Sequence, residues 1–481
     1  MKGNTTKYGW TTASTKVICR SSDGTVVQAR PLRLDKHAVT IEVAAPDCPL
    51  RTSELLQDLQ IVLQDQVVYS GQGTVRSLVD AGTNVACEVT LEPAGWKLFE
   101  QPGSPVKDGW FGERFKEFLN EWQKLYKVSP QYKAVVADMN TFLTDLRLWV
   151  EQLELALGPG AGRASQKDQE LIAEKLAKPV LPCIDALFEK FEAVAAKVEP
   201  DLAPVHYTYA RRQLHPVVLC APLLHRAFVK PLGYAGDYKT VEMIALNRYE
   251  GASLFAKLIN AWFLRQPPAA GHRNRLLRFK KQLAEETARA LSAKKQKVSI
   301  LNVGCGPAWE VQQFVAQDPL SSYAEFTLLD FNPETIRYVM DILGEIKTQH
   351  RRRTKFNVIQ LSVQQLLRQE RLSNSELDVP KFDFIYCGGL FDYLSDGVCM
   401  RLIELLYKWL GPDGLLVVTN LDPSNPSRGT MEHIADWHLM YRSARDLLAL
   451  KPEKLRCAET RVYADSTGTN LFLELRKPHD A

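Results

Sequence analysis

The 481-residue sequence lacks any uninterrupted apolar run near the roughly 18 residues that span a bilayer, and it opens with no apolar signal segment. A strong charge of either sign is also missing, since the formal net charge is +4 and the basic residues are dispersed apart from Arg351-Arg352-Arg353. Such a short triplet is typical of a solvated helix end. We therefore expect a cytoplasmic protein without a membrane span and without a nucleic-acid partner.

Motifs for metal binding and for nucleophilic hydrolysis are absent as well. The nine cysteines are scattered without a C-x-x-C pair, which is typical of a reducing compartment. His206, His215, His225 and His272 fall in one region, but no two of them have the close spacing of zinc ligands on a helix. No G-x-S-x-G elbow occurs. Neither a metal site nor a serine hydrolase is predicted.

The sequence does contain a glycine turn between Val298 and Glu310, where an apolar run breaks into Gly304-Cys305-Gly306 and resumes as a helix-like segment. Glycines let the backbone approach a ligand closely, and the start of a helix offers unpaired N–H groups. The third small residue of the dinucleotide fingerprint is missing, because Trp309 stands in its place. The turn therefore predicts a nucleotide-type ligand without a pyrophosphate.

An acidic residue ends the next predicted strand, Phe326–Asp330. Asp330 follows Gly306 at about the 20-residue offset that nucleoside-binding sheets use, and its carboxylate can accept hydrogen bonds from both ribose hydroxyls. Further apolar runs at 355–361, 383–387, 414–420, 455–463 and 470–475 alternate with helical stretches except between the last pair. This order predicts a mostly parallel α/β sheet with an antiparallel end, and a ligand at the carboxyl ends of its strands.

These motifs, together with Phe382–Cys387 and Gly411–Val418, resemble the class I S-adenosylmethionine-dependent methyltransferases over about residues 295–478. The resemblance implies a Rossmann-like sheet with S-adenosyl-L-methionine as cofactor and no metal. Asn302 stands where many members of that family carry an acid. The cofactor-binding residues that the resemblance implies are Gly304, Cys305, Gly306, Pro307, Asp330, Phe331, Ser362, Val363, Cys387, Gly388 and Gly389.

Residues 1–100 contain short alternating runs separated by turn signals, which predicts a small antiparallel β-barrel or sandwich. Their order resembles the PilZ domain, a bacterial barrel whose better-known members bind cyclic di-GMP. The R-x-x-x-R arm of that family is absent, since Arg30 and Arg33 are closer together, and Asp35–Val39 lacks the serine and glycine of its turn. We expect a degenerate barrel that serves packing or partner contact. Arg20, Arg30 and Arg33 are the residues to test for dinucleotide binding.

Residues 106–290 change to a helical period after the Pro/Gly-rich boundary Gln101–Pro105. Apolar stripes at 115–126 and 139–153 predict a helical core or a homodimer seam, and a flexible break at 158–162 precedes an amphipathic stretch at 166–198. These patterns predict an all-helical middle domain between the barrel and a catalytic domain at 295–481.

The loop Lys230–Tyr238 combines two glycines, two tyrosines and an acid, which suits a surface turn. It also resembles the K-P-x-G-Y-x-G-D-Y segment of a bacterial methyltransferase group related to 3-hydroxy fatty acid methyl ester synthases. Glu250–Phe255, Asp436–Arg442 and Thr467–Phe472 extend that second resemblance over roughly residues 200–478. We expect the helical region, including Tyr234, Asp237 and Tyr238 of this loop, to fold over the cofactor pocket as a lid and to form much of the substrate wall.

Methyl transfer requires a base only when the nucleophile must lose a proton, so an acceptor that is already a carboxylate needs none. Asp392 in the loop Gly388–Tyr393 is either a base or the N-cap of the next helix. Met431–Arg442, read as a helix, places His433, Trp437 and Tyr441 on one face, either around an acyl acid or in an amphipathic core. Candidate catalytic residues are Asp392, Tyr234, Asp237 and His433, and candidate substrate contacts are Tyr238, Leu390, Phe391, Trp437, Tyr441 and Arg442.

The function that these observations favour is methyl transfer to a small molecule, with the carboxylate of a hydroxylated fatty acid as acceptor and a methyl ester as product. An oxygen or nitrogen of another metabolite is the alternative acceptor. A third possibility is a catalytically silent protein that binds a signal and regulates.

Overall fold

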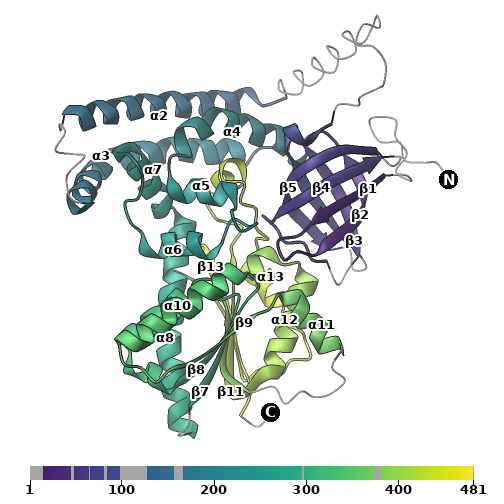
Figure 1. The fold of residues 1–481 in the computed structure, drawn as a ribbon, viewed down its shortest axis with the longest axis vertical. Coiled ribbons are helices and arrows are strands. Elements are labelled where there is room, and N and C mark those ends of the chain that lie inside the picture. The colour runs from purple at the N-terminus through teal and green to yellow at the C-terminus, as the bar shows by residue number, and fades with distance from the viewer. Residues whose placement is uncertain are drawn as a thin grey trace, which may run out of the picture.

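The computed structural model describes residues 15–44, 48–63, 66–80, 84–97, 127–156, 166–294, 297–372 and 381–479. A β-barrel, a helical body and a mixed sheet follow one another along the chain, and all of them meet near the centre of the molecule (Figure 1). The predicted boundary at 101–105, the helical stripe at 115–126 and the break at 158–162 lie outside the described residues.

The N-terminal strands close into an antiparallel barrel in the order β1-β2-β3-β6-β5-β4, which confirms the predicted barrel. Alternate residues such as Val17, Val39 and Ile41 point inward and are fully buried. The strands are β1 (Thr15–Arg20), β2 (Val26–Leu34), β3 (Ala38–Ala44), β4 (Leu55–Leu63), β5 (Gln66–Asp80) and β6 (Asn84–Leu91), followed by a short 3₁₀ turn η2 (Pro93–Gly95). A bulge at Gln57-Asp58 interrupts the alternation of β4 between Leu56 and Leu59.

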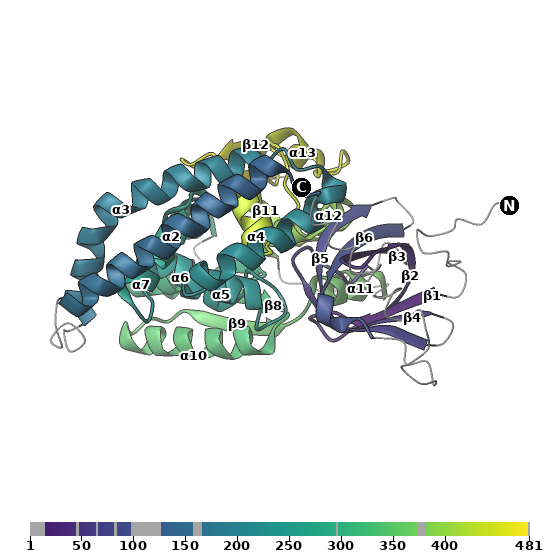
Figure 2. The same ribbon diagram turned by 90° about the horizontal axis from the view of Figure 1, so that it is seen from above.

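The helical body packs α2 and α3 side by side over the shorter helices (Figure 2). The predicted stripe on α2 is its core face, since Met139, Leu143 and Val150 are fully buried. The elements are α2 (Pro130–Ala156), α3 (Gln166–Ala195), η3 (Pro200–Leu202), α4 (Ala203–Val218), α5 (Pro222–Val229), α6 (Tyr238–Leu246), α7 (Leu254–Arg265) and α8 (Pro267–Lys294). α8 leaves this body and packs on the sheet through Phe279 and Leu283.

The C-terminal sheet has the order β12-β13-β11-β10-β7-β8-β9, in which β13 pairs antiparallel with both β11 and β12, and the strands from β11 to β9 pair in parallel. This arrangement confirms the predicted Rossmann-like fold with an antiparallel end. Its strands are β7 (Val298–Val303), β8 (Ala324–Asp330), β9 (Lys355–Gln360), β10 (Phe382–Cys387), β11 (Leu410–Leu421), β12 (Glu459–Ala464) and β13 (Asn470–Arg476). The helices are α9 (Trp309–Gln317), η4 (Pro319–Tyr323), α10 (Pro333–Gln349), α11 (Val363–Leu372), η5 (Phe391–Tyr393), α12 (Asp396–Trp409), η6 (Thr430–Ile434) and α13 (Ala444–Ala449).

Helices cover both faces of this sheet because its central strands are apolar on both sides. Ile300 and Leu328 pack in the layer with α8, α9 and α10, whereas their neighbours Leu301 and Leu329 pack in the layer with α11 and α12. The strand order reverses between β7 and β10. Among the described residues, none of the helices combines the length and apolarity that a bilayer crossing requires.

The prediction of one helix from Met431 to Arg442 is wrong. Regular helix is limited to the π turn η6, and the chain then passes through a left-handed residue, Asp436, at φ +54°. Asp436 bonds to the buried Lys230 and to Arg211, so tertiary contacts decide the local conformation here. The proposed shared helical face through Trp437 therefore does not exist.

Candidate active site

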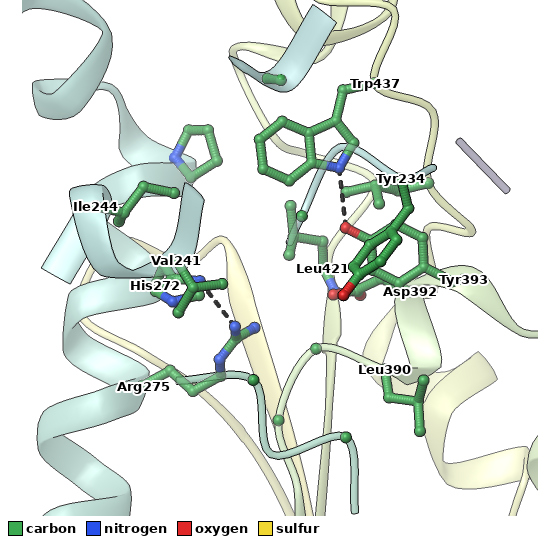
Figure 3. A pocket seen from close by; sticks show the side chains of 18 of the residues that line it. Tyr234, Val241, Ile244, His272, Arg275, Leu390, Asp392, Tyr393, Leu421 and Trp437 are labelled. Atoms are coloured by element: carbon green, nitrogen blue, oxygen red, sulfur yellow. Dashed lines mark hydrogen bonds between the residues drawn. The ribbon is translucent and has the colours of Figure 1, made fainter. Parts of the chain in front are cut away.

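A cavity of about 220 Å³ lies at the carboxyl ends of β7, β8, β10 and β11, where the barrel, the helical body and the sheet meet. Its walls come from the loops that follow these strands, from α5, α6, α7 and α8, and from two loops of the barrel. Figure 3 shows Val241, Ile244, His272 and Arg275 on one side of the cavity, facing Trp437 and Tyr393 on the other. The position agrees with the predicted site at the switch in strand order.

The glycine turn after β7 forms the floor of this cavity. The N–H groups of Gly304 and Cys305 both donate to the Leu329 carbonyl, at 2.8 and 2.9 Å, which fixes the turn against β8. Gly304 and Gly306 have φ values of +71° and +51°, and a Cβ added at Gly306 would meet nothing within 4 Å. The backbone of the turn is therefore open to a ligand, as the sequence predicts for this segment.

Asp330 lies beside the turn and is 6% exposed. Its Oδ2 accepts the Gly306 N–H at 3.1 Å, and its Oδ1 accepts the Asn332 N–H at 3.0 Å. Burial raises the pKa of Asp330, while these two hydrogen bonds act in the opposite direction. Because each carboxylate oxygen has a further lone pair, Asp330 can still accept from a pair of neighbouring hydroxyls.

Glu310 is a site residue that sequence reasoning missed. It is 3% exposed and lines the cavity, and its Oε1 accepts from Asn302 Nδ2 at 3.0 Å and from the Tyr386 hydroxyl at 2.7 Å. Among the described side chains, Oε2 has no donor. The sequence did contain one signal, because Asn302 stands where many members of the resembled family carry an acid. In the structure, Asn302 bonds to an acid on the following helix α9, namely Glu310.

Arg275 on α8 is the second residue that was missed, and it is 6% exposed within the cavity. It donates to His272 Nδ1 at 2.8 Å and to Asn470 Oδ1 at 3.2 Å, and it forms no ion pair with a carboxylate among the described residues. A Cβ at Gly389 would come within 2.9 Å of the guanidinium, so glycine is required for this close approach. An unpaired, buried guanidinium favours an anionic ligand group.

The bond from Arg275 also fixes the tautomer of His272 (Figure 3). Arginine only donates, so Nδ1 must accept and the ring hydrogen must be on Nε2. Burial lowers the pKa of His272 well below its usual value, and the nearby Arg275 and Arg273 lower it further, so the ring is neutral. The Nε2 atom is buried without a hydrogen-bond partner in the described structure, and it can donate to a ligand.

Asp392 contributes a carboxylate to the opposite wall and is 3% exposed. Its predicted alternative role as a helix N-cap is wrong, because it lies inside η5 and Ser395 stands at the N-cap of α12. Its Oδ1 accepts the Leu421 N–H at 2.7 Å. Burial raises the pKa of Asp392 to about 6, although Arg275 and Arg442 oppose this change. Asp392 can therefore exchange a proton near neutral pH.

The rest of the cavity wall is largely apolar. Trp437 faces the cavity, and its Nε1 donates to the Tyr393 hydroxyl at 3.0 Å (Figure 3). The apolar residues that line the cavity from the helical body and the adjoining loop include Leu223, Leu224, Ala227, Val241, Ile244, Phe263, Leu276, Leu421, Met431, Ala435 and Leu439. Such a wall suits an acceptor that is mostly hydrocarbon.

Several further residues predicted for the site do line the cavity. They are Cys305, Pro307, Phe331, Gly388, Gly389, Tyr234, Tyr238, Leu390 and Trp437. Tyr234 packs against the Phe331 ring with centroids 5.2 Å apart, and the Tyr238 hydroxyl donates to Glu334 at 3.0 Å. The loop Lys230–Tyr238 therefore covers the cavity with its aromatic residues.

Three predicted cofactor contacts, and the predicted substrate contact Phe391, lie outside the cavity lining. Cys387 and Phe391 are fully buried in the apolar layer that carries α12. Ser362 accepts the Gln365 N–H at 3.2 Å at the start of α11, and Val363 packs beneath that helix. The resemblance placed Cys387, Ser362 and Val363 by their position in the chain, whereas in the structure Cys387 and Val363 pack in the apolar layer of α11 and α12.

The predicted catalytic residues Asp237 and His433 have structural partners outside the cavity lining. Asp237 caps α6 by accepting the Thr240 N–H at 2.9 Å and forms an ion pair with Arg226. His433 Nδ1 lies 2.7 Å from the Tyr132 hydroxyl, within the helical body.

Two predicted substrate contacts are likewise engaged elsewhere. Arg442 is 3% exposed and donates to the Asp396 carboxylate, to Asn420 and to two backbone carbonyls, so it ties loops together and does not receive a substrate acid. Tyr441 packs under the Arg428 guanidinium, which lies 4.6 Å from its ring centroid.

Comparison with known protein families adds one match. Residues 272–451 match the model of the family described as methyltransferase domain. The matched segment runs from α8 to α13, so it contains Arg275, the glycine turn, Glu310, Asp330 and Asp392. Over these residues, the chain is therefore similar to a methyltransferase domain. No curated protein matches this chain.

Among solved structures, the chain is similar to a possible exported protein from Bordetella parapertussis, with 16% identity, 53% of this chain and 86% of that chain covered, and a TM-score of 0.39. It is also similar to the N-methyltransferase NodS from Bradyrhizobium japonicum WM9 in complex with S-adenosyl-L-homocysteine (18%; 50% and 98% covered; 0.30). A third is magnesium protoporphyrin IX methyltransferase from Synechocystis PCC 6803 with S-adenosylhomocysteine bound (12%; 44% and 84%; 0.31).

Proposed function

We propose that this protein transfers a methyl group from S-adenosylmethionine to an apolar small molecule. The observation that carries the proposal is the distribution of charge around the glycine turn. A buried cation, Arg275, and a buried acid, Glu310, suit the carboxylate and the ammonium of an amino acid, while Asp330 suits the hydroxyls of a ribose. The carboxylate of Glu310 would repel phosphate groups at the glycine turn, so the site disfavours a phosphorylated coenzyme.

The cofactor would supply a methyl group on a positively charged sulfur. The chain's own residues hold the amino-acid end with Arg275 and Glu310 and the ribose with Asp330. Leu390 and the apolar side chains of α5 to α8 exclude water and orient the acceptor. No residue needs to form a covalent bond during such a displacement.

The acceptor that the sequence resemblance implies is the carboxylate of a hydroxylated fatty acid. The apolar wall supports this acceptor, because an acyl chain would be buried against Ile244, Phe263 and Met431. His272 Nε2–H is available to a carboxylate oxygen. The product would be a methyl ester, and no base would be required.

A second acceptor class is favoured by Asp392. A buried carboxylate beside the acceptor repels another carboxylate, whereas it can take the proton from a hydroxyl or an amine. The raised pKa of Asp392, about 6, keeps it mostly ionised above neutral pH and still basic enough to accept that proton. An oxygen or nitrogen of an apolar metabolite is therefore the second candidate.

Transfer of an isotopically labelled methyl group tests the proposal. Purified protein is incubated with labelled S-adenosylmethionine and separately with fatty acids, apolar alcohols or phenols, and apolar amines. Label in methyl esters supports the first acceptor class, and label in ethers or methylamines supports the second. Saturable cofactor binding without transfer to any of these classes would instead favour the regulatory binding protein.

Replacing Asp330 with alanine is expected to weaken S-adenosylhomocysteine binding by about 1–3 kcal/mol, because both hydroxyl bonds are lost. Titration calorimetry measures the change. Asp341→Ala is the matched control, since Asp341 is exposed on α10 away from the cavity. Equal affinities of the Asp330 variant and the wild type would exclude the ribose role.

A further inference from the structure

A barrel loop, residues 48–55, enters the wall of the cavity between the helical body and the sheet. The Leu55 N–H donates to the Gly233 carbonyl at 2.5 Å, and the Thr52 N–H donates to the Tyr393 carbonyl at 3.4 Å. Ser53 Oγ donates to the His438 carbonyl at 2.8 Å. The loop is thus fixed to both other parts of the molecule.

Glu54 holds this loop in shape from inside. It is 1% exposed, and its Oε1 accepts from the Ser22 N–H and hydroxyl at 2.6 and 2.7 Å. Its Oε2 accepts the Arg51 N–H at 2.7 Å. A buried carboxylate with this many donors is costly to move, so the loop presents the side chains of Arg51 and Thr52 in a fixed position.

Both side chains line the cavity, and Arg51 lies at its nucleoside end, beside Phe331. The Arg51 guanidinium lies 4.2 Å from the centroid of the Phe331 ring, directly after Asp330, and Arg51 is 9% exposed. Among the described residues, it forms no ion pair with a carboxylate. Thr52 is 1% exposed and lines the cavity, and its Oγ1 has no hydrogen-bond partner in the described structure. The Thr52 hydroxyl is therefore free to bond to a ligand, and the Arg51 guanidinium, which lies over Phe331, has no ion-paired carboxylate in the described part of the chain that would compete with one.

We propose that Arg51 and Thr52 make the barrel a working part of the cofactor site, with Arg51 as a positioning residue for the purine nucleoside. A flat guanidinium stacks on aromatic rings and carries several N–H donors, so it can cover a purine or donate to its ring nitrogens. The Thr52 hydroxyl supplies a further hydrogen bond. This inference rests on the proposed function and adds a residue from outside the methyltransferase domain.

The barrel's role differs from the sensor that its sequence resembles. Arg20 and Arg33, on its strands, form ion pairs with Asp58 and Asp201 on the surface, at 3.3 and 3.1 Å. Neither lines the cavity, whereas the loop with Arg51 does. The barrel therefore acts on the reaction through this loop, with no need for a ligand of its own.

The experiment compares Arg51→Ala and Arg51→Lys with Arg20→Ala, which removes the same charge from an exposed site of the same barrel. Each full-length variant is titrated with S-adenosylhomocysteine and with 5′-methylthioadenosine, which lacks the amino-acid end. We expect the Kd of both ligands to rise by about tenfold or more in Arg51→Ala, with a smaller rise in Arg51→Lys and none in Arg20→Ala. Glu310→Gln should weaken only S-adenosylhomocysteine.

Wild-type affinity of Arg51→Ala for both ligands would overturn the inference, and so would a loss confined to S-adenosylhomocysteine. If Arg51→Ala fails to fold, Arg51→Lys, which keeps the buried charge, and Arg51→Gln are titrated in its place. Wild-type affinity of both of these variants for both ligands would overturn the inference equally. Failure of the wild type to bind either ligand would refute the proposed function itself, and this inference with it.

Discussion

Asp392→Asn is expected to lower kcat by about 10²–10⁴-fold on a hydroxyl or amine acceptor, because the amide cannot take the proton. The pH profile should change as well. Since the base must be ionised, the wild-type rate should fall as the pH drops through about 6, the raised pKa of Asp392. The variant should lack this acid limb, and steady-state kinetics at several pH values measure both effects.

Asp413→Asn is the control for this prediction, because Asp413 lies at the far end of β11 from the cavity and pairs with His479 at 2.8 Å. It should leave the rate and the profile unchanged. Wild-type rates in Asp392→Asn would contradict a base role and would favour a carboxylate acceptor, which needs no deprotonation.

Asp436→Ala is expected to lower the free energy of unfolding by about 3–5 kcal/mol, because it leaves a buried charge without its partner. Lys230 is 2% exposed, and its Nζ lies 2.6 Å from Asp436 Oδ2, while Arg211 donates to Oδ1 at 2.7 Å. Burial alone would raise the pKa of Asp436, but Arg211 and Lys230 outweigh burial and lower it well below its usual value. Urea denaturation measures the loss.

The same buried acid connects the parts of the molecule, since Lys230 also donates to Thr74 of the barrel at 3.2 Å. Arg147→Ala is the matched control, because its ion pair with Glu151 on α2 is exposed and should contribute less than about 0.5 kcal/mol. If Asp436→Ala and this control have equal free energies of unfolding, the contact between the barrel and the helical body does not depend on the buried ion pairs of Asp436.

The fold and the cofactor end of the site were predictable because their signals are local. Gly304 and Gly306 are recognisable because a strand, a glycine turn and the start of a helix follow one another within a dozen residues. The alternation of β and α segments predicts the sheet. Asp330 ends a strand, so its place beside the turn follows from the parallel order. The structure places all of these in one cavity.

The remainder of the site depends on contacts that no local pattern reveals. Arg275 comes from a helix that precedes the sheet, and Arg51 comes from a barrel more than 200 residues away in sequence. The Met431–Arg442 segment has helical spacing, yet the buried ion pairs of Asp436 override that tendency. Tertiary contacts also explain why Arg442, which we predicted to contact the substrate, is buried and instead connects two loops through its hydrogen bonds to Asn420 and Leu394.

Calorimetric titration of the full-length protein with S-adenosylhomocysteine, and in parallel with NAD, tests the central claim most directly. The distribution of Arg275, Glu310 and Asp330 predicts saturable binding of S-adenosylhomocysteine and no binding of NAD. Heat from NAD alone would contradict that claim and would place a phosphorylated coenzyme in this cavity.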